Sequence, residues 1–148
     1  MNPITALAVI LTLVVAATAL GLAWRARQGR IATVDGVVIT PTDVASESPF
    51  GPHATLLQFS TELCARCPGT ARLLAGVADS RPGVAHLDVD LTHRADLANR
   101  FGVMQTPTTL ILDGAGRVRA RIGGVPHRDG IAKHLDDLTG STHAQLVH

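Results

Sequence analysis

The pattern of hydrophobic and polar positions divides the chain into an apolar N-terminal run and a longer, mixed segment. Residues 4–24 carry no charged side chain. As a helix rising 1.5 Å per residue, this run reaches about 31 Å, the hydrocarbon thickness of a bilayer. Trp24 ends the run, where an indole prefers the membrane interface, and three arginines follow. The pattern predicts a transmembrane helix over residues 4–24. Those arginines are Arg25, Arg27 and Arg30.

A cleaved signal peptide is the alternative interpretation of this run, because Ala17-Thr18-Ala19 resembles a small-residue cleavage site. The run lacks a basic region before it and is longer than the apolar core of a signal peptide. We therefore expect an uncleaved anchor in the cell membrane. Basic flanks stay on the cytoplasmic side, so we expect the following domain in the cytoplasm, with an extracytoplasmic domain as the alternative.

Beyond the anchor we expect a juxtamembrane segment over 25–53, a folded domain over 54–140 and a flexible tail over 141–148. Within the first of these, Asp35-Gly36 lies between two β-branched runs and predicts a hairpin over residues 31–40, with one bent strand as the alternative. The rest of this segment, 41–53, is predicted as a loop with a short helical turn after Pro41. Further strands are predicted at 54–60, 84–91, 108–112 and 117–122, and helices at 68–79, 92–101 and 126–138.

This order of elements predicts an α/β fold. A strand–helix–strand start and a hairpin–helix finish imply a mixed central sheet flanked by helices. Thr92 is the expected N-cap of the second helix, and Gly102 its stop. Gly140 is expected just past the last helix, and residues 143–148 as a frayed end.

Charge and composition narrow the function classes. Thirteen basic and twelve acidic residues give a formal net charge of +1, and only 3% of residues are aromatic. Nucleic acid is therefore not expected as a partner, because such proteins carry basic patches.

The chain has two cysteines, Cys64 and Cys67, between a predicted strand and a predicted helix. Two thiols at this spacing can close a disulfide with each other. A helix N-terminus lowers a thiol pKa through its partial positive charge, and Arg66 between the cysteines adds to that charge. The pattern predicts a dithiol–disulfide oxidoreductase, with no metal and no organic cofactor.

Four motifs together resemble the thioredoxin family, over about residues 54–138. With the anchor and its arginine-rich flank, the chain is similar to membrane-anchored thioredoxin-like proteins of actinobacteria. The motifs are Phe59-Ser60-Thr61-Glu62-Leu63-Cys64-Ala65-Arg66-Cys67, Leu87-Asp88-Val89-Asp90, Phe101-Gly102-Val103-Met104-Gln105-Thr106-Pro107-Thr108 and Gly123-Gly124.

The resemblance implies a thioredoxin-like fold and a division of roles between the cysteines. Cys64 would be the nucleophile, and Cys67 would resolve the mixed disulfide. Thr106 and Pro107 would form a cis peptide beside the sulfurs and a wall for an extended substrate segment. The implied partners are a protein disulfide substrate and a thiol electron donor.

Among the departures from the family pattern, two bear on the chemistry of the cysteines. Leu63 stands where thioredoxins usually carry tryptophan, and Gln58 where they usually carry a buried carboxylate that helps to deprotonate the resolving cysteine. An amide cannot take that proton at neutral pH. Water or another group must then do so, and Glu62 and His86 are the candidates.

Three other functions compete with a membrane-anchored disulfide reductase. The cysteines could form half of a structural zinc site, but no second cysteine pair exists. Thr61-Glu62-Leu63-Cys64 resembles the Thr-x-x-Cys of peroxiredoxin-like thiol peroxidases, without their upstream proline. A non-catalytic membrane adaptor could bind a peptide at the sheet edge near Thr106.

Overall fold

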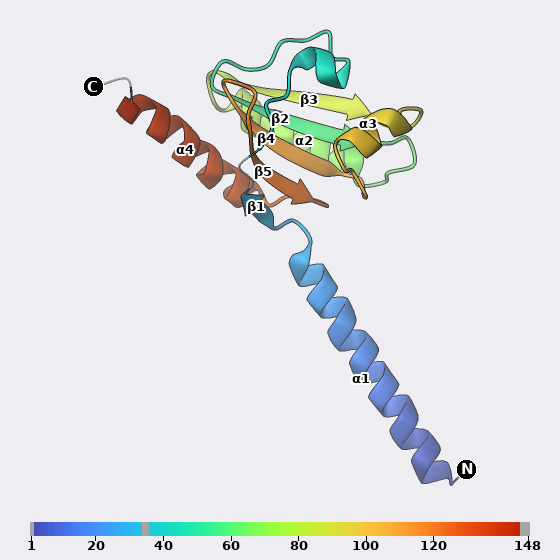
Figure 1. Ribbon diagram of the computed structural model, residues 1–148. Coiled ribbons are helices and arrows are strands. Elements are labelled where there is room, and N and C mark those ends of the chain that lie inside the picture. Colours follow the sequence, from blue (N-terminus) through green and yellow to red (C-terminus); the bar gives the residue numbers. More distant parts are fainter. Residues whose placement is uncertain (1, 34–35, 146–148) are drawn as a thin grey trace.

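The computed structural model describes residues 2–33 and 36–145, and it begins with a helix that stands clear of the domain (Figure 1). This helix, α1, spans Pro3–Arg27, and none of its residues is buried. The side chain of Asn2 caps its first turn, and Arg25 and Arg27 lie in its last turn, where basic side chains complement the helix dipole. The helix contains the predicted span and is long and apolar enough to cross a membrane.

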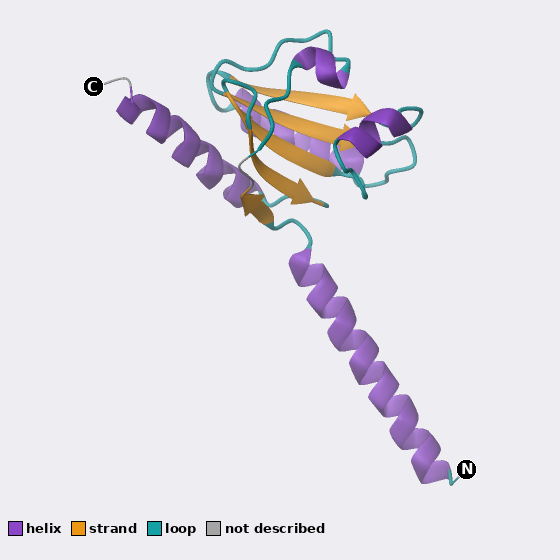
Figure 2. Ribbon diagram, in the orientation of Figure 1, coloured by secondary structure: helices purple, strands orange, loops and turns teal. Residues whose placement is uncertain are grey.

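A five-stranded mixed sheet forms the centre of the domain, in the order β1-β5-β4-β2-β3 (Figure 2). β2 and β3 are parallel, and the remaining neighbours are antiparallel. This confirms the predicted α/β fold. The strands are β1 Ile31–Thr33, β2 Ala54–Ser60, β3 Val84–Asp90, β4 Thr108–Asp113 and β5 Val118–Gly123.

The hairpin predicted over residues 31–40 is wrong. Ile31 pairs with Ile122, and Val38 forms a bridge with Arg117, so both halves run antiparallel along β5. The free edge of β5 supplies the partners that the hairpin would have supplied locally. The alternative of one bent strand stays a prediction, because β1 covers only Ile31–Thr33, Val38 forms an isolated bridge, and 34–35 lie outside the described residues. The predicted helical turn after Pro41 is present as a 3-10 turn, η1, over Pro41–Val44.

Three helices complete the domain: α2 Cys67–Asp79, α3 Ala95–Arg100 and α4 Arg128–Gln145. The prediction of Thr92 as an N-cap is wrong, because α3 has Arg94 at that position. The Thr92 hydroxyl instead donates to Asp90 and accepts the backbone N–H of Glu62 at 2.9 Å. It therefore ties the end of β3 to the loop after β2.

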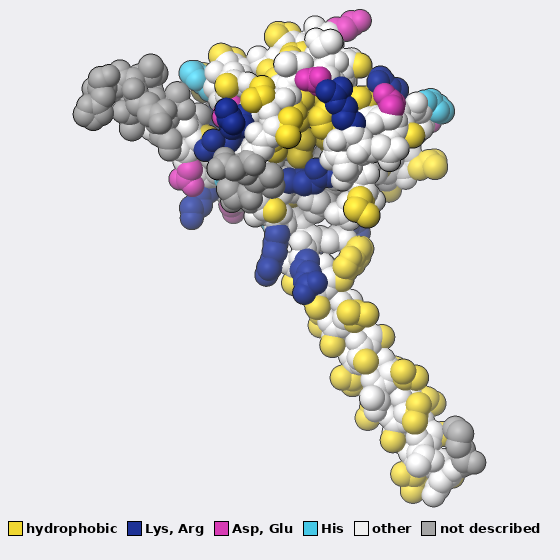
Figure 3. All heavy atoms as spheres, in the orientation of Figure 1, with side chains coloured by type: hydrophobic (Ala, Val, Ile, Leu, Met, Phe, Trp, Pro, Cys, Tyr) yellow, Lys and Arg dark blue, Asp and Glu magenta, His cyan; other side chains and the backbone are white. Residues whose placement is uncertain are grey.

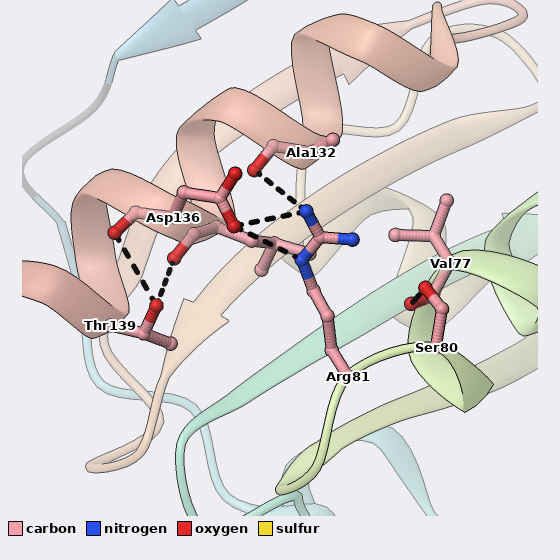
Figure 4. Close-up of polar contacts among 7 residues, drawn as sticks. Val77, Ser80, Arg81, Ala132, Asp136 and Thr139 are labelled. Atoms are coloured by element: carbon pink, nitrogen blue, oxygen red, sulfur yellow. Dashed lines mark hydrogen bonds and ion pairs between the residues drawn. The ribbon is translucent and has the colours of Figure 1, made fainter.

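The last helix runs through Gly140 to Gln145, so the predicted stop at Gly140 is wrong, while the flexibility of the tail from residue 141 stays a prediction. Residues 146–148 lie outside the described residues. A glycine costs a helix only about 1 kcal/mol and ends it when the backbone turns left-handed, which Gly140 does not. Arg81, after α2, holds α4 through Asp136 at 2.9 Å (Figure 4).

The sheet has a hydrophobic core on each face. Helices α2 and α4 pack on one face, around Leu56, Leu74 and Ile131. On the other face, Phe59 packs with residues of η1 and α3. Because β2 lies between β4 and β3 and its seven residues are all buried, its end is held on both sides. The loop that follows Ser60 therefore starts from a rigid position.

Candidate active site

The two cysteines lie in the connection between β2 and α2, joined as a disulfide with their Cα atoms 5.4 Å apart. The loop after β2 turns back through the backbone N–H of Cys64, which donates to the carbonyl of Thr61 at 3.1 Å. Cys67 is the first residue of α2 and only 4% exposed, whereas Cys64 is partly exposed. An incoming substrate therefore meets Cys64 first.

The start of α2 gives Cys64 less support than an open helix N-terminus would. The N–H of Cys67 donates to the carbonyl of Cys64 at 3.1 Å, and Pro68 in the first turn has no N–H. Two of the first N–H positions are thus unavailable to a Cys64 thiolate. The side chain of the N-cap residue, Arg66, makes no capping hydrogen bond.

A buried amide lies beneath Cys67. Gln58 is fully buried, and its Nε2 donates to the carbonyl oxygen of Cys67 at 3.1 Å. Its Oε1 then faces Nε2 of His86 at 3.2 Å, so that nitrogen of His86 must carry the hydrogen. Burial lowers the pKa of His86, against the opposing charges of Asp88 and Asp79. A neutral histidine is therefore linked to the backbone of Cys67 through a single side chain.

The other predicted proton carrier, Glu62, is exposed, and its backbone N–H donates to Thr92. The structure adds a carboxylate whose role the sequence did not predict, Asp88, which accepts a 2.6 Å hydrogen bond from the hydroxyl of Ser60. Ser60 is two residues after Gln58 and therefore on the same face of β2. The parallel pairing of Gln58 with Asp88 would have been the signal for this contact.

The peptide bond between Thr106 and Pro107 is cis, as predicted, and Pro107 is buried. The Thr106 hydroxyl lies 3.3 Å from that of Thr61, which brings this loop beside the cysteine loop. The carbonyl of Pro107 accepts the N–H of Gly124 at 2.8 Å. Gly124 has a φ of +84°, a backbone that glycine adopts readily.

Exposed apolar side chains and an arginine lie around the disulfide. Leu63 and Met104, on the cysteine and proline loops, are each 97% exposed. Arg66 is exposed, and its Nη1 donates to Oε1 of Gln28 at 3.2 Å. The guanidinium of Arg66 therefore makes its hydrogen bond with the residue that follows α1. Nothing in the sequence pointed to Gln28 as a neighbour of the site.

These features define a class of protein. A family model described as thioredoxin matches residues 44–137, well over half of the chain. The chain belongs to the thioredoxin family, and its Cys64–Cys67 pair makes it a thiol–disulfide oxidoreductase. The narrower likeness to actinobacterial membrane-anchored proteins stays a prediction.

One curated relative is similar to this chain in sequence, and solved structures share its fold. A thioredoxin from Chlorobaculum thiosulfatiphilum is 30% identical over 90 residues, which cover 59% of this chain and 81% of the relative. Among solved structures, a mutant thioredoxin from Halobacterium salinarum superposes with a TM-score of 0.53, at 21% identity, over 66% of this chain and 80% of that one. A thioredoxin-like protein from Clostridium perfringens gives 0.50 at 25% identity, over 60% and 72%.

Proposed function

We propose that the protein is a membrane-anchored disulfide reductase. The observation that carries this proposal is a dithiol site joined to an apolar helix of which no residue is buried. The hydroxyls of Thr12 and Thr18 donate to carbonyls of their own helix, each at 2.8 Å. A helix whose polar groups are satisfied internally is what a bilayer requires.

The reduced pair would act in two steps. The Cys64 thiolate attacks a substrate disulfide, forms a mixed disulfide and releases one substrate thiolate. Cys67 then loses its proton and attacks the Cys64 sulfur, which releases the second substrate thiolate. Two electrons pass to the substrate, the two sulfurs released take up two protons, and Cys64 and Cys67 become a disulfide. A thiol donor restores the dithiol by the same exchange in reverse.

The neighbouring residues would support these steps. Thr106 and Pro107 form the substrate-side wall, and the Thr106 backbone pairs with an extended segment. Arg66 contributes positive charge beside the thiolate. For proton transfer from Cys67, His86 and Glu62 stay the candidate acceptors; His86 would have to accept at Nδ1 through water, because its Nε2 already carries a hydrogen toward Gln58.

We place the domain in the cytoplasm. Arg25, Arg27 and Arg30 follow the apolar run, and basic flanks stay on that side. The cytoplasmic thiol pool would keep the pair reduced, which favours reduction of substrates. Fusion of alkaline phosphatase to the C-terminus tests this: it should be inactive, and an active fusion would place the domain outside.

The activity itself is tested with the full chain in detergent, a dithiol donor and a protein disulfide substrate. Wild type should turn over, and the Cys64→Ser, Cys67→Ser double variant should not. A titration of the Cys64–Cys67 couple against glutathione or dithiothreitol buffers distinguishes a reductase from an adaptor. A couple that cannot be cycled between its oxidised and reduced forms would support the adaptor instead.

A further inference from the structure

The segment that leaves the anchor is bonded to the same end of the domain that carries the dithiol. Gln28, the C-cap residue of α1, accepts the hydrogen bond of Arg66, which directly precedes Cys67. The N–H of the next residue, Gly29, donates to the carbonyl of Gly123 at 2.9 Å. α1 therefore leaves the domain beside the redox loops (Figure 1).

Close packing fixes this junction. Gly29 has a φ of +73°, and a Cβ there would lie 2.5 Å from the carbonyl oxygen of Val125. Only a glycine can make this approach without moving the backbone. Gly124, beside Gln28, donates in turn to the carbonyl of Pro107 at 2.8 Å. The junction thus contacts the cysteine loop directly and the proline loop through Gly124.

This junction sets the height of the site above a bilayer. If residues 4–24 span the hydrocarbon, Gln28 lies about 6 Å beyond Trp24, within the headgroup layer. Gln28, in the headgroup layer, is then hydrogen-bonded to the side chain of Arg66, which directly precedes Cys67. Basic side chains gather where α1 joins the domain, above a helix with a hydrophobic surface (Figure 3).

We propose that the substrate is an integral membrane protein whose disulfide lies at the membrane surface, in a short loop or at a helix end. This inference rests on the proposed function. The Gln28–Gly29 junction holds Cys64 at that level, and a disulfide far above the bilayer is out of reach. The exposed side chains of Leu63 and Met104 suit a segment that is itself partly apolar, as interfacial segments are. The exchange is the two-electron reduction described above.

The test uses the full chain in lipid nanodiscs, pre-reduced with a dithiol and measured in a single turnover. One substrate is a transmembrane helical peptide with an intramolecular disulfide at its helix end. A second carries the same disulfide beyond a 15-residue helical spacer, about 22 Å further from the bilayer. A third is the same disulfide in a soluble peptide. Each membrane peptide lies in the same disc as the enzyme. The difference between their reduction rates therefore reports only the height of the disulfide above the bilayer.

We expect wild type to reduce the surface disulfide at least about tenfold faster than the raised one, through effective concentration. Inserting twelve Gly/Ser residues between Arg27 and Gln28 leaves the junction's own contacts in place and adds a reach of about 20 Å. This variant should lose the preference and keep its rate on the soluble peptide. The same insertion after His148 is the matched control and should keep the preference.

Equal wild-type rates on the two membrane peptides would overturn the inference, and so would a preference that survives the insertion before Gln28. In either case a normal rate on the soluble peptide would leave the reductase function standing. No reduction of any of the three substrates would instead refute the proposed function, and the inference with it. Gly29→Ala provides a second probe, because it disturbs only the junction and should weaken the preference.

Discussion

The two cysteines lie three residues apart in opposite surroundings. Cys67 is 4% exposed, and its backbone carbonyl accepts from the buried amide of Gln58, which in turn contacts the half-buried His86. Cys64 is partly exposed and is preceded by Leu63, whose side chain is almost fully exposed. A substrate disulfide can reach the sulfur of Cys64 from solvent. The sulfur of Cys67 is buried, so its proton must leave by way of water or a neighbouring side chain. The difference supports the proposal that Cys64 attacks and Cys67 resolves.

The largest expected effect follows from removing the sulfur of Cys64. Cys64→Ser should lower the rate of protein disulfide reduction by at least about a thousandfold, because the attacking nucleophile is lost. The rate is measured in steady state with a dithiol donor. The free energy of unfolding under reducing conditions should stay within about 0.5 kcal/mol of reduced wild type, which shows that the variant is folded. Substantial turnover by this variant would contradict the assignment.

The buried layer is tested at Gln58. Gln58→Asp places a proton acceptor beneath Cys67 and should speed resolution of the mixed disulfide by at least about threefold. This gain is smaller than that from a general base aligned with the proton it removes. It should also destabilise the domain by about 1–3 kcal/mol, because a buried polar group loses partners. Stopped-flow measurement of the second step gives the rate.

Gln58→Asn is the matched control for that substitution. The asparagine side chain has the length of aspartate and cannot take the proton of Cys67. The variant should therefore destabilise the domain without speeding resolution of the mixed disulfide. Equal rates for the two variants would remove proton acceptance as the reason for any gain.

The exposed side is tested at Leu63. Leu63→Ala should raise KM for a protein disulfide by about threefold to tenfold, since about 1.4 kcal/mol of lost contact is tenfold. The rate on a small-molecule disulfide should not change. Val37 is also exposed and apolar, at 77%, and lies beside Val118 at the other end of β5 from Gly123. Val37→Ala should leave both substrates unaffected, and a rise in KM there would show that exposed apolar area alone was responsible.

The smallest effect concerns pH. The pKa of His86 is lower in the folded domain than its ordinary value of 6.5, because burial disfavours the charged ring. The unfolded chain therefore binds more protons as the pH falls through 6.5, and stability rises with pH in this window. This contribution is fully present above the unfolded pKa and is lost as the pH falls towards the folded pKa.

His86→Asn should accordingly lose less stability than wild type between about pH 7.5 and pH 5.5. Denaturant titrations at several pH values measure this. His134 has a pKa lowered in the same direction by burial, and it is present in both proteins, so the difference isolates His86. Identical pH profiles would show that the surroundings of His86 do not favour its neutral form.

The sequence predicted the parts of the molecule that depend on local pattern. The apolar run, the order of strands and helices and the cysteine spacing are local signals, and each appears in the structure. The predictions failed where a distant partner decided the outcome. Asp35-Gly36 is a sound hairpin signal, but the edge of β5 paired with residues on both sides of it. Thr92 does not cap α3, and its hydroxyl forms hydrogen bonds with Glu62 and Asp90 instead.

The site shows the same division. Cys64, Cys67 and Pro107 were predicted from motifs of fixed spacing. The contact of His86 with Gln58 depends on the parallel register of β2 and β3, which pattern alone does not give. The bond between Arg66 and Gln28 joins residues 38 positions apart through the packing of a linker. No periodicity or motif encodes that contact.

Trapping of the mixed disulfide tests whether Cys64 attacks and Cys67 resolves. Cys67→Ser removes the resolving sulfur and should leave a stable mixed disulfide between Cys64 and the substrate, released by added dithiol. Mass spectrometry of the adduct locates the linked cysteine. We expect a Cys64 adduct with Cys67→Ser and no comparable adduct with Cys64→Ser. A trapped adduct on Cys67, or full turnover by either variant, would contradict it.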